Sequence, residues 1–196
     1  NLREAIRYSL LGPGKRMRPI LVIRSCEAVG GGAEQALAPA AAIEMIHAFS
    51  LVHDDLPAMD DDDLRRGRPT LHRHASEAMA ILAGDGMMAL AVELVTTRVG
   101  DATLARRLVH ELVVGTNDMI AGQVYDTLGE FEETTPGLEK LHTIHRNKTG
   151  ALIRASCRMG GLCGGADEAA LEALTVYADA IGLMFQVVDD LLDVTQ

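Results

Sequence analysis

Residues 36–63 read ALAPAAAIEMIHAFSLVHDDLPAMDDDD, and this stretch decides the fold. Its first part, residues 36–53, repeats alanine, leucine, isoleucine and methionine at three- and four-residue spacing, which predicts a largely buried α-helix. Pro57 prevents normal continuation of that helix, so Asp54 and Asp55 close it and the other aspartates lie beyond it. Carboxylates there face the negative end of the helix dipole and repel one another, so the arrangement is unfavourable without a cation.

The same helical periodicity covers most of the chain. It recurs in four further segments, 77–95, 104–125, 138–160 and 167–194. Glycine and proline gather at junctions that we interpret as interhelical loops, namely 12–14, 30–32, 136–137 and 160–165, with an acidic connection at 128–136. Alternating β-branched runs are hard to find, so the sequence predicts an all-α fold. We expect one domain over residues 1–196, with the native N-terminus and further C-terminal helices outside it.

The net charge of −10 comes from two aspartate clusters. Six aspartates lie between Asp54 and Asp63 and three between Asp189 and Asp193; without these nine, the 28 acidic residues fall to 19, against 18 basic ones. Such a local excess of negative charge favours a bound cation over an acidic solvated surface. The overall negative charge, the aromatic content of 3% and the lack of tryptophan argue against nucleic acid as a partner.

Membrane insertion and disulfide bonding also have little support. Charges interrupt the longest apolar runs, so we expect no membrane-spanning helix. The three cysteines, Cys26, Cys157 and Cys163, form no CxxC spacing and indicate neither a disulfide framework nor a zinc site. A reducing, cytoplasmic location therefore fits best.

The second aspartate cluster lies inside a helix predicted over residues 181–194. Asp189 and Asp193 are four residues apart and share one face of that helix, while Asp190 points about 100° away. The flanking residues are apolar, so these carboxylates are expected to line a cavity. Ligands made only of oxygen favour a hard cation such as Mg²⁺, which commonly adds substrate phosphates to one or two carboxylates. The alternative, a solvated acidic face, is disfavoured because both clusters interrupt apolar helices.

Basic residues that could meet those phosphates occur in three short segments. They are GPGKRMRP at 12–19, RRGRP at 65–69 and KTG at 148–150. The first combines a flexible loop with three cations, which suits a diphosphate. It is not a Walker A loop, because no serine or threonine follows Lys15 and no strand precedes it. Each segment alone could equally be a basic surface turn.

Five segments in order resemble the motifs of the trans-prenyltransferase (polyprenyl synthetase) family. They are GKRMRP at 14–19, DDLPAMD at 54–60, RRG at 65–67, KTG at 148–150 and FQVVDDLLD at 185–193. Each motif is weak alone, but five in order make the match specific, and it is most like bacterial farnesyl diphosphate synthases. The chain departs from the family pattern at Pro13, where glycine is usual.

The resemblance implies an isoprenoid-synthase-type helical bundle around a central active-site cavity, in which three Mg²⁺ ions bind an allylic diphosphate. The implied metal ligands are Asp54, Asp60 and Asp189, with Asp55, Asp190 and Asp193 in supporting or water-mediated contacts. The residues implied to bind isopentenyl diphosphate are Lys15, Arg18, His47 and Arg66. Those implied to address the allylic diphosphate are Arg65, Lys148, Thr149 and Gln186, and the last three could also steady the carbocation. A homodimer is implied as well.

The implied reaction is chain elongation: the allylic C1–O bond ionises, the isopentenyl double bond attacks the carbocation, and a proton is lost. Phe49, five residues before Asp54, would form the floor of the tunnel for the growing chain. A bulky ring there implies a C15 product, farnesyl diphosphate, whereas a smaller residue would permit C20 geranylgeranyl diphosphate. A terpene cyclase would lack the Lys15 loop, and a non-catalytic subunit would usually have a damaged aspartate motif. An acidic helical interaction protein would not explain the matched basic segments.

Overall fold

The computed structural model describes the backbone of residues 1–195, together with their side chains except those of residues 189, 190 and 193–195. The described chain is mainly helical and contains one two-stranded antiparallel hairpin. In chain order the elements are α1 (Leu2–Leu10), α2 (Met17–Ala28), α3 (Ala33–Asp54), β1 (Leu64–Arg65), β2 (Arg68–Pro69), α4 (Leu71–His74), α5 (Glu77–Arg98), α6 (Ala102–Leu128), α7 (Gly137–Ile144), the π-helix η1 (His145–Gly150), α8 (Ala151–Cys163) and α9 (Glu168–Thr195). The all-α prediction is confirmed.

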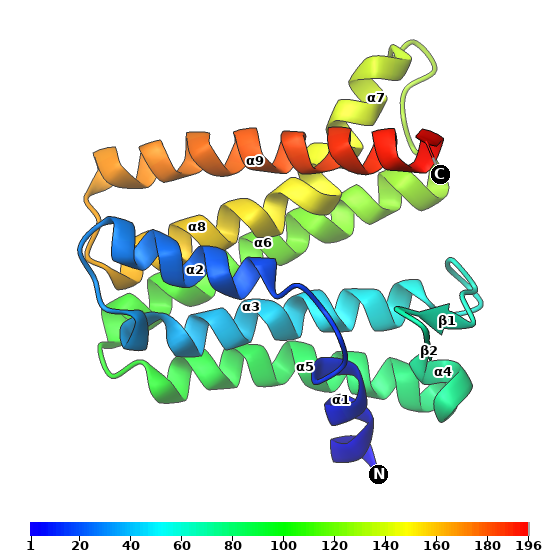
Figure 1. Cartoon of the computed structure of the whole chain (residues 1–196), viewed down its shortest axis with the longest axis horizontal. Helices are drawn as coiled ribbons and strands as arrows, with labels where there is room; N and C mark the ends of the chain where they lie inside the picture. The colour runs from blue at the N-terminus through cyan, green and yellow to red at the C-terminus, as the bar shows by residue number, and fades with distance from the viewer. Residues whose placement is uncertain (196) are drawn as a thin grey trace.

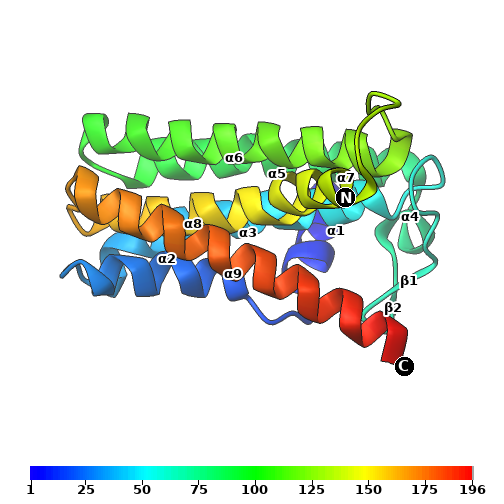
Figure 2. The same ribbon diagram turned by 90° about the horizontal axis from the view of Figure 1, so that it is seen from above.

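The long helices form a bundle around α3 (Figure 1). α3 packs against α2, α5 and α8, and α8 in turn packs against α6 and α9. Figures 1 and 2 agree that the long helices run roughly along one axis and that the C-terminal ends of α3 and α9 lie at the same end of the bundle. The backbone segments that carry the two aspartate clusters are therefore brought to one end by folding.

α3 is the central helix because apolar residues cover most of its surface. Its buried apolar residues are Ala36, Pro39, Ala40, Ala42, Ile43, Ile46, Ala48, Phe49 and Val52. Most of them belong to a single core cluster shared with α2, α5 and α8. The helix ends at Asp54 with Asp55 as its C-cap, which agrees with the break expected from Pro57.

The helix predicted over residues 138–160 is a succession of α7, η1 and α8. Gly160 and Gly161, predicted to lie in a loop, belong to α8. That prediction was wrong because Gly160 serves helix packing: a Cβ there would lie 2.1 Å from the carbonyl oxygen of Val22 on α2. α2 and the hairpin were also missed, since a 12-residue helix with Pro19 in its first turn and two-residue strands give little periodic signal.

By length and composition alone, three helices of the described chain are long and apolar enough to cross a membrane. They are Ala33–Asp54, Glu77–Arg98 and Glu168–Val188. This differs from the prediction that charges interrupt the apolar runs too often for a membrane-spanning helix. For α3, 56% of the apolar window is buried in the bundle, so core packing accounts for its composition. α5 and α9 bury 33% and 17% of theirs and leave apolar side chains exposed.

Gly160→Ala is expected to destabilise the protein by about 1–3 kcal/mol, because the added methyl group overlaps the backbone of α2, not a side chain that can move aside. Gly137→Ala in α7 is the matched control, since nothing lies within 4 Å of a Cβ at that position. Urea unfolding of both variants measures the difference in the free energy of unfolding. Equal stabilities of the two variants would contradict close packing of α2 on α8 at Gly160.

Candidate active site

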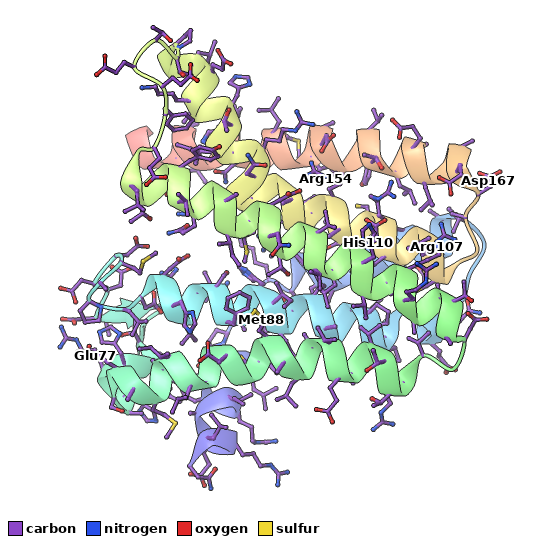
Figure 3. All side chains as sticks on the ribbon, turned by 180° about the vertical axis from the view of Figure 1, so that it is seen from behind. Glu77, Met88, Arg107, His110, Arg154 and Asp167 are labelled. Carbon is purple, nitrogen blue, oxygen red and sulfur yellow. The ribbon has the colours of Figure 1, made fainter. Side chains whose placement is uncertain are left out.

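A cavity of about 600 Å³, here called the large cavity, lies between α3, α5, α6 and η1. Its polar lining residues are Arg18, His47, Ser50, His53, Asp54, Asp85, Gln123, Thr127, Lys148 and Thr149. Its apolar lining residues are Phe49, Leu51, Ala58, Met59, Met88, Met119, Ile120, Val124 and Leu128. Figure 3 shows Met88 of α5 pointing toward α3. The cavity therefore combines charged groups with an extended apolar wall.

Two faces of α3 contribute polar and apolar side chains to the lining of the large cavity. His47 and Asp54 lie two helical turns apart and share one face, whereas Phe49 and His53 share the opposite one. The ring of Phe49 meets the His53 ring edge to face, with 5.7 Å between centroids. Nε2 of His53 in turn lies 3.1 Å from the carbonyl oxygen of Ile81 on α5. These contacts fix the Phe49 face of α3 against α5.

Asp54 carries a half-buried carboxylate that no described cation pairs with directly. Burial raises the pKa of Asp54 to about 6, with the charge of Lys148 opposing the rise and that of Asp60 adding to it. The loop after α3 folds back so that the N–H of Asp60 donates to the carbonyl oxygen of Asp54 at 2.8 Å. The fold thus places two aspartates close together in a partly buried site, which a hard cation would stabilise.

Asp55 faces a different environment from its neighbour. It is buried, and Arg65 contacts its Oδ1 through Nε at 2.6 Å and Nη2 at 2.5 Å. Burial raises the pKa of Asp55, and the hydrogen bond from Arg65 opposes that rise. Arg65 also lies 3.3 Å from Asp62. The charge of Asp55 is therefore neutralised by Arg65. The role of Asp55 as a metal ligand and the role of Arg65 in binding substrate stay predictions.

Lys148 and Thr149 line the large cavity from η1. The π-helix fits closely against α6 because Gly122 has no side chain: a Cβ there would lie 2.2 Å from the backbone nitrogen of Lys148. Nζ of Lys148 lies 2.6 Å from Oδ2 of Asp126. Its charge also lowers the pKa of Asp54. Lys148 therefore brings positive charge to the carboxylate end of α3.

The predicted site residues on α9 are placed only in part. Gln186 is half-buried and is not among the described residues that line the large cavity. The side chains of Asp189, Asp190 and Asp193 lie outside the described residues, so their predicted ligand roles stay predictions. The backbone of α9 nevertheless carries these positions to the same end of the bundle as Asp54 (Figures 1 and 2).

α9 is anchored to its neighbours by two arginines of α8. Nη1 of Arg154 lies 2.9 Å from Oδ1 of Asp179, and Figure 3 shows Arg154 at the junction of α8 and α9. Nη1 of Arg158 donates to the Thr175 hydroxyl at 2.9 Å, and its Nε and Nη2 both donate to Glu111 on α6 at 2.8 Å. These contacts join α6, α8 and α9 and so fix the position of α9 along the bundle.

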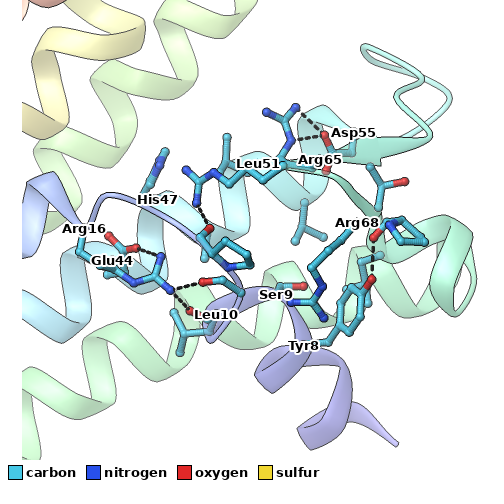
Figure 4. Close-up of a pocket in the computed structure, with 18 residues that line it drawn as sticks. Tyr8, Ser9, Leu10, Arg16, Glu44, His47, Leu51, Asp55, Arg65 and Arg68 are labelled. Carbon is cyan, nitrogen blue, oxygen red and sulfur yellow. Dashed lines mark hydrogen bonds and ion pairs between the residues drawn. The ribbon is translucent and has the colours of Figure 1, made fainter.

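A second cavity of about 70 Å³, here called the small cavity, lies between α1, the loop before α2, α3 and the hairpin (Figure 4). Its charged and titratable lining residues are Arg16, Glu44, His47, Asp55, Arg65, Arg66 and Arg68. Figure 4 shows Arg16 approaching from the loop and Arg65 and Arg68 from the hairpin. Four arginines against two acids make this region positive, as an anion site requires.

The residues predicted to bind isopentenyl diphosphate do not all lie together. Arg66 lines the small cavity, Arg18 the large one and His47 both, whereas Lys15 is exposed and is part of neither lining. Burial and the nearby charges of Arg18 and Arg66 lower the pKa of His47 to about 2, so its ring is neutral. Burial lowers the pKa of Arg18 to about 10, and its buried Nε has no hydrogen-bond partner among the described residues. An anionic ligand would satisfy that donor.

Two residues around the small cavity, Tyr8 and Glu44, were missed by the sequence analysis, and Arg68 was included there only as part of the basic segment at 65–69. The hydroxyl of Tyr8 donates to the carbonyl of Pro69 at 2.8 Å, and the Arg68 guanidinium lies 4.2 Å from the centroid of the Tyr8 ring. Glu44 accepts a hydrogen bond from Arg16 at 2.9 Å. The available signal for Glu44 was its place one helical turn before His47, but Tyr8 and Arg68 are brought together only by folding.

The described side chains form no group of three or more histidines, cysteines, aspartates and glutamates arranged to hold a metal. The residues present nevertheless fit Mg²⁺, which uses one or two carboxylates and takes its other oxygen ligands from water and phosphate. Asp54 and Asp60 supply such carboxylates, and burial, which raises the pKa of Asp54 to about 6, would favour a cation beside it.

Known proteins resemble this chain along its whole length. A family model described as polyprenyl synthetase matches residues 1–196. Geranylgeranyl pyrophosphate synthase 11, chloroplastic, from Arabidopsis thaliana is 48% identical over 201 residues, which cover 100% of this chain and 56% of that protein. The chloroplastic geranylgeranyl pyrophosphate synthase of Capsicum annuum is 48% identical over 199 residues, which cover 100% and 54%. The chain thus spans about half the length of these curated relatives.

Solved structures share the fold. An FPP/GFPP synthase from Zymomonas mobilis, in its apo form, superposes with a TM-score of 0.93 at 38% identity, covering 98% of this chain and 71% of that one. A putative farnesyl-diphosphate synthase from Marinomonas sp. MED121 gives a TM-score of 0.88 at 47% identity, covering 99% and 70%. The prediction of an isoprenoid-synthase-type bundle is confirmed.

Asp54→Asn is expected to raise the free energy of unfolding by about 1 kcal/mol at neutral pH without divalent cations. The folded protein keeps the Asp54 proton up to a pKa of about 6, against an ordinary value of 3.8. The free-energy cost of ionising Asp54 in the folded protein is therefore absent below pH 3.8. It grows between pH 3.8 and about pH 6 and reaches its full value above that range. Wild type should lose stability relative to the variant as pH rises across that range, as measured by chemical denaturation.

Glu130→Gln, at an exposed position, is the control for removing one negative charge. A neutral-pH stability of Asp54→Asn below that of wild type would show that the Asp54 carboxylate is compensated after all.

Proposed function

The chain belongs to the polyprenyl synthetase family, and we propose that the protein is a prenyl diphosphate synthase. Its substrates are isopentenyl diphosphate and an allylic diphosphate, dimethylallyl or geranyl. The observation that carries the proposal is the undercompensated Asp54 carboxylate beside Asp60, in a cavity that Arg18 and Lys148 also line. The charged groups suit a metal-bound diphosphate, and the apolar wall suits a prenyl chain.

In this proposal the large cavity takes the allylic substrate. Lys148 and Thr149 contact its diphosphate, with Arg65 and Gln186 as further predicted contacts. The apolar side chains of α3, α5 and α6 receive the prenyl chain and exclude water from the reacting carbon.

Isopentenyl diphosphate binds where the two cavities approach each other at His47, the residue that lines both. Arg18 and Arg66 supply positive charge on the two sides, and the exposed Lys15 is the predicted fourth contact. His47 contributes a hydrogen bond and no charge, because its pKa is about 2.

Asp54 and Asp60 are proposed to hold two Mg²⁺ ions and Asp189 a third, with Asp55, Asp190 and Asp193 in supporting or water-mediated contacts. When bound there, Mg²⁺ would supply positive charge to the allylic diphosphate and so favour its departure. Lys148 adds positive charge to the same region. The allylic C1–O bond breaks, the isopentenyl double bond forms the new C–C bond to C1, and a proton leaves. The released diphosphate is the proposed proton acceptor, because a histidine with the pKa of His47 is too weak a base.

The proposed product is the C15 compound farnesyl diphosphate. Phe49 is 6% exposed, lines the large cavity and is held in place by the His53 ring, which supports its proposed role as the tunnel floor. The C20 product geranylgeranyl diphosphate is the alternative, and it is favoured by the names of the plant relatives.

The other candidate functions explain fewer features. A terpene cyclase handles one diphosphate, whereas arginines here surround a second cavity next to the first. A non-catalytic subunit would not need a metal site, and so it does not explain the undercompensated Asp54 carboxylate. A homodimer is proposed from the exposed apolar side chains of α5 and α6 that do not line the large cavity, which include Leu82, Leu90, Val113 and Val114. A cytoplasmic location stays a prediction, in keeping with three unpaired cysteines.

Chain elongation by the whole protein tests the proposed function. Purified protein is incubated with Mg²⁺, isopentenyl diphosphate and either dimethylallyl or geranyl diphosphate, and the products are identified by chromatography. We expect elongated prenyl diphosphates, lost on addition of a chelator and reduced at least about 100-fold by Asp54→Asn, because the Mg²⁺ that would bind the allylic diphosphate then loses a protein ligand. Absence of elongation by folded wild-type protein would overturn the proposal.

Phe49→Ala is expected to shift the main product beyond 15 carbons, because removing the ring lengthens the apolar cavity. The change is read from the product distribution with both allylic substrates. Phe131→Ala is the matched control, since this ring stacks on Tyr125 and is no part of the large cavity lining. An unchanged distribution for Phe49→Ala would place the floor of the tunnel elsewhere, and a wild-type C20 product would overturn the C15 assignment alone.

A further inference from the structure

The guanidinium of Arg16, in the loop before α2, forms hydrogen bonds to other groups of this chain. Its Nη1 donates to Oε1 of Glu44 at 2.9 Å, and its Nη2 donates to the carbonyl oxygens of Leu10, at 3.0 Å, and Gly12 (Figure 4). Arg18, two residues later, has the opposite character: its buried Nε has no hydrogen-bond partner among the described residues. The two arginines of the same motif are therefore not equivalent, because only Arg18 presents an unmet donor.

The backbone of Arg16 also indicates a structural role. Arg16 is the N-cap of α2 and has φ 51°, in the left-handed region that residues other than glycine seldom adopt. Such a conformation persists where surrounding contacts compensate for it, and the three hydrogen bonds of the side chain provide them. They close the loop from Leu10 to Arg16 into a compact turn.

Gly14 explains how this turn fits beneath the hairpin. A Cβ at Gly14 would lie 2.5 Å from Nη1 of Arg16 and 2.3 Å from Nη1 of Arg66. Both guanidiniums therefore pack over the bare backbone at this position. Arg66 donates to the carbonyl of Pro13 as well, so the hairpin and the Arg16 contacts hold the turn from two sides.

Glu44 connects the turn to the central helix. It is 9% exposed and lies one helical turn before His47 on α3. Its carboxylate also raises the pKa of Arg18, so it acts electrostatically on the buried guanidinium as well. The Arg16–Glu44 ion pair therefore sets the position of the loop and of Arg18 relative to His47.

From this geometry we infer that Arg16 and Glu44 are a positioning pair for the isopentenyl diphosphate site: they fix the loop that carries Lys15, and the start of α2 that carries Arg18, relative to α3 and His47, and they do not themselves bind phosphate. The inference rests on the proposed function and assigns separate tasks to the cations of the GKRMRP motif. Removing Arg16 would free the turn and leave the Glu44 carboxylate buried without its partner.

Steady-state kinetics of Arg16→Met in the whole protein tests this role. We expect the KM for isopentenyl diphosphate to rise about tenfold or more, with the KM for the allylic diphosphate and kcat changed less than about threefold, because the turn contacts only one substrate site. Arg16→Lys retains the ion pair but not the fork to the two carbonyls, so it should recover part of the loss. Arg24→Met is the control, since Arg24 is an exposed arginine of α2 paired with Glu27.

Glu44→Gln separates positioning from direct binding. If Arg16 is held by Glu44, this variant raises the KM for isopentenyl diphosphate in the same way, and the double variant with Arg16→Met is no worse than the more severe single variant. If Arg16 binds phosphate directly, removing the competing carboxylate leaves that KM unchanged or lowers it, and the inference is overturned. Equal rises in both KM values for Arg16→Met, or an effect no larger than that of Arg24→Met, also overturn it.

Thermal unfolding of each variant shows whether the protein remains folded during the assays. If Arg16→Met does not fold, binding of isopentenyl diphosphate to Glu44→Gln is measured by calorimetry; if Glu44→Gln does not fold, binding to Arg16→Met is measured. Weakened binding is expected in either case, and unchanged binding overturns the inference. Failure of wild type to elongate any allylic diphosphate is a different result, because it refutes the proposed function before any variant is compared.

Discussion

The undercompensated negative charge of Asp54, at the end of a buried helix, is the constraint on which the rest of this structure depends. α3 runs through the middle of the bundle because nearly all its faces are apolar, and it stops at Asp54 because Pro57 cannot continue the helix. Asp54 then lies at the negative end of the helix dipole, partly out of water, with Asp60 folded back beside it. The bundle therefore presents a carboxylate that protein groups alone leave undercompensated.

The arginines around this end of α3 divide into two groups. Arg65 neutralises Asp55 and Arg16 neutralises Glu44, so two buried acids are satisfied within the chain. Asp54 and Arg18 are left as groups of opposite charge with unmet interactions, and both line the large cavity. A metal-bound diphosphate at Asp54 and a second diphosphate at Arg18 would complement such a surface. The satisfied pairs build the site, and the unsatisfied groups make it a site for a ligand.

Helical periodicity predicted most of the bundle correctly because long amphipathic or buried segments repeat their pattern many times. The same reasoning failed at Gly160 and Gly161, where glycine signals close approach of α2 and α9, respectively, and not a loop. It predicted the helical course of residues 145–150 but not their π-helical form, since a π-helix differs from an α-helix by a hydrogen-bonding pattern that residue spacing does not reveal. Most of the described residues chosen for the site line one of the two cavities, but Lys15 is exposed outside both, and Glu44 and Tyr8 were overlooked. Their roles toward substrate and metal stay predictions.

The sequence by itself determined the class of fold, the break after Asp54 and the kind of chemistry that aspartate clusters and basic loops support, because each follows from residues close together in the chain. Only the tertiary structure decided which charges cancel. Asp54 and Asp55 are adjacent in sequence, but one lines the large cavity and the other is paired with Arg65 from the hairpin. Arg16 and Arg18 are likewise near neighbours, but a contact with Glu44 on α3 occupies only the first. Burial and long-range pairing set the free energy of each charge, and neither is encoded in local spacing.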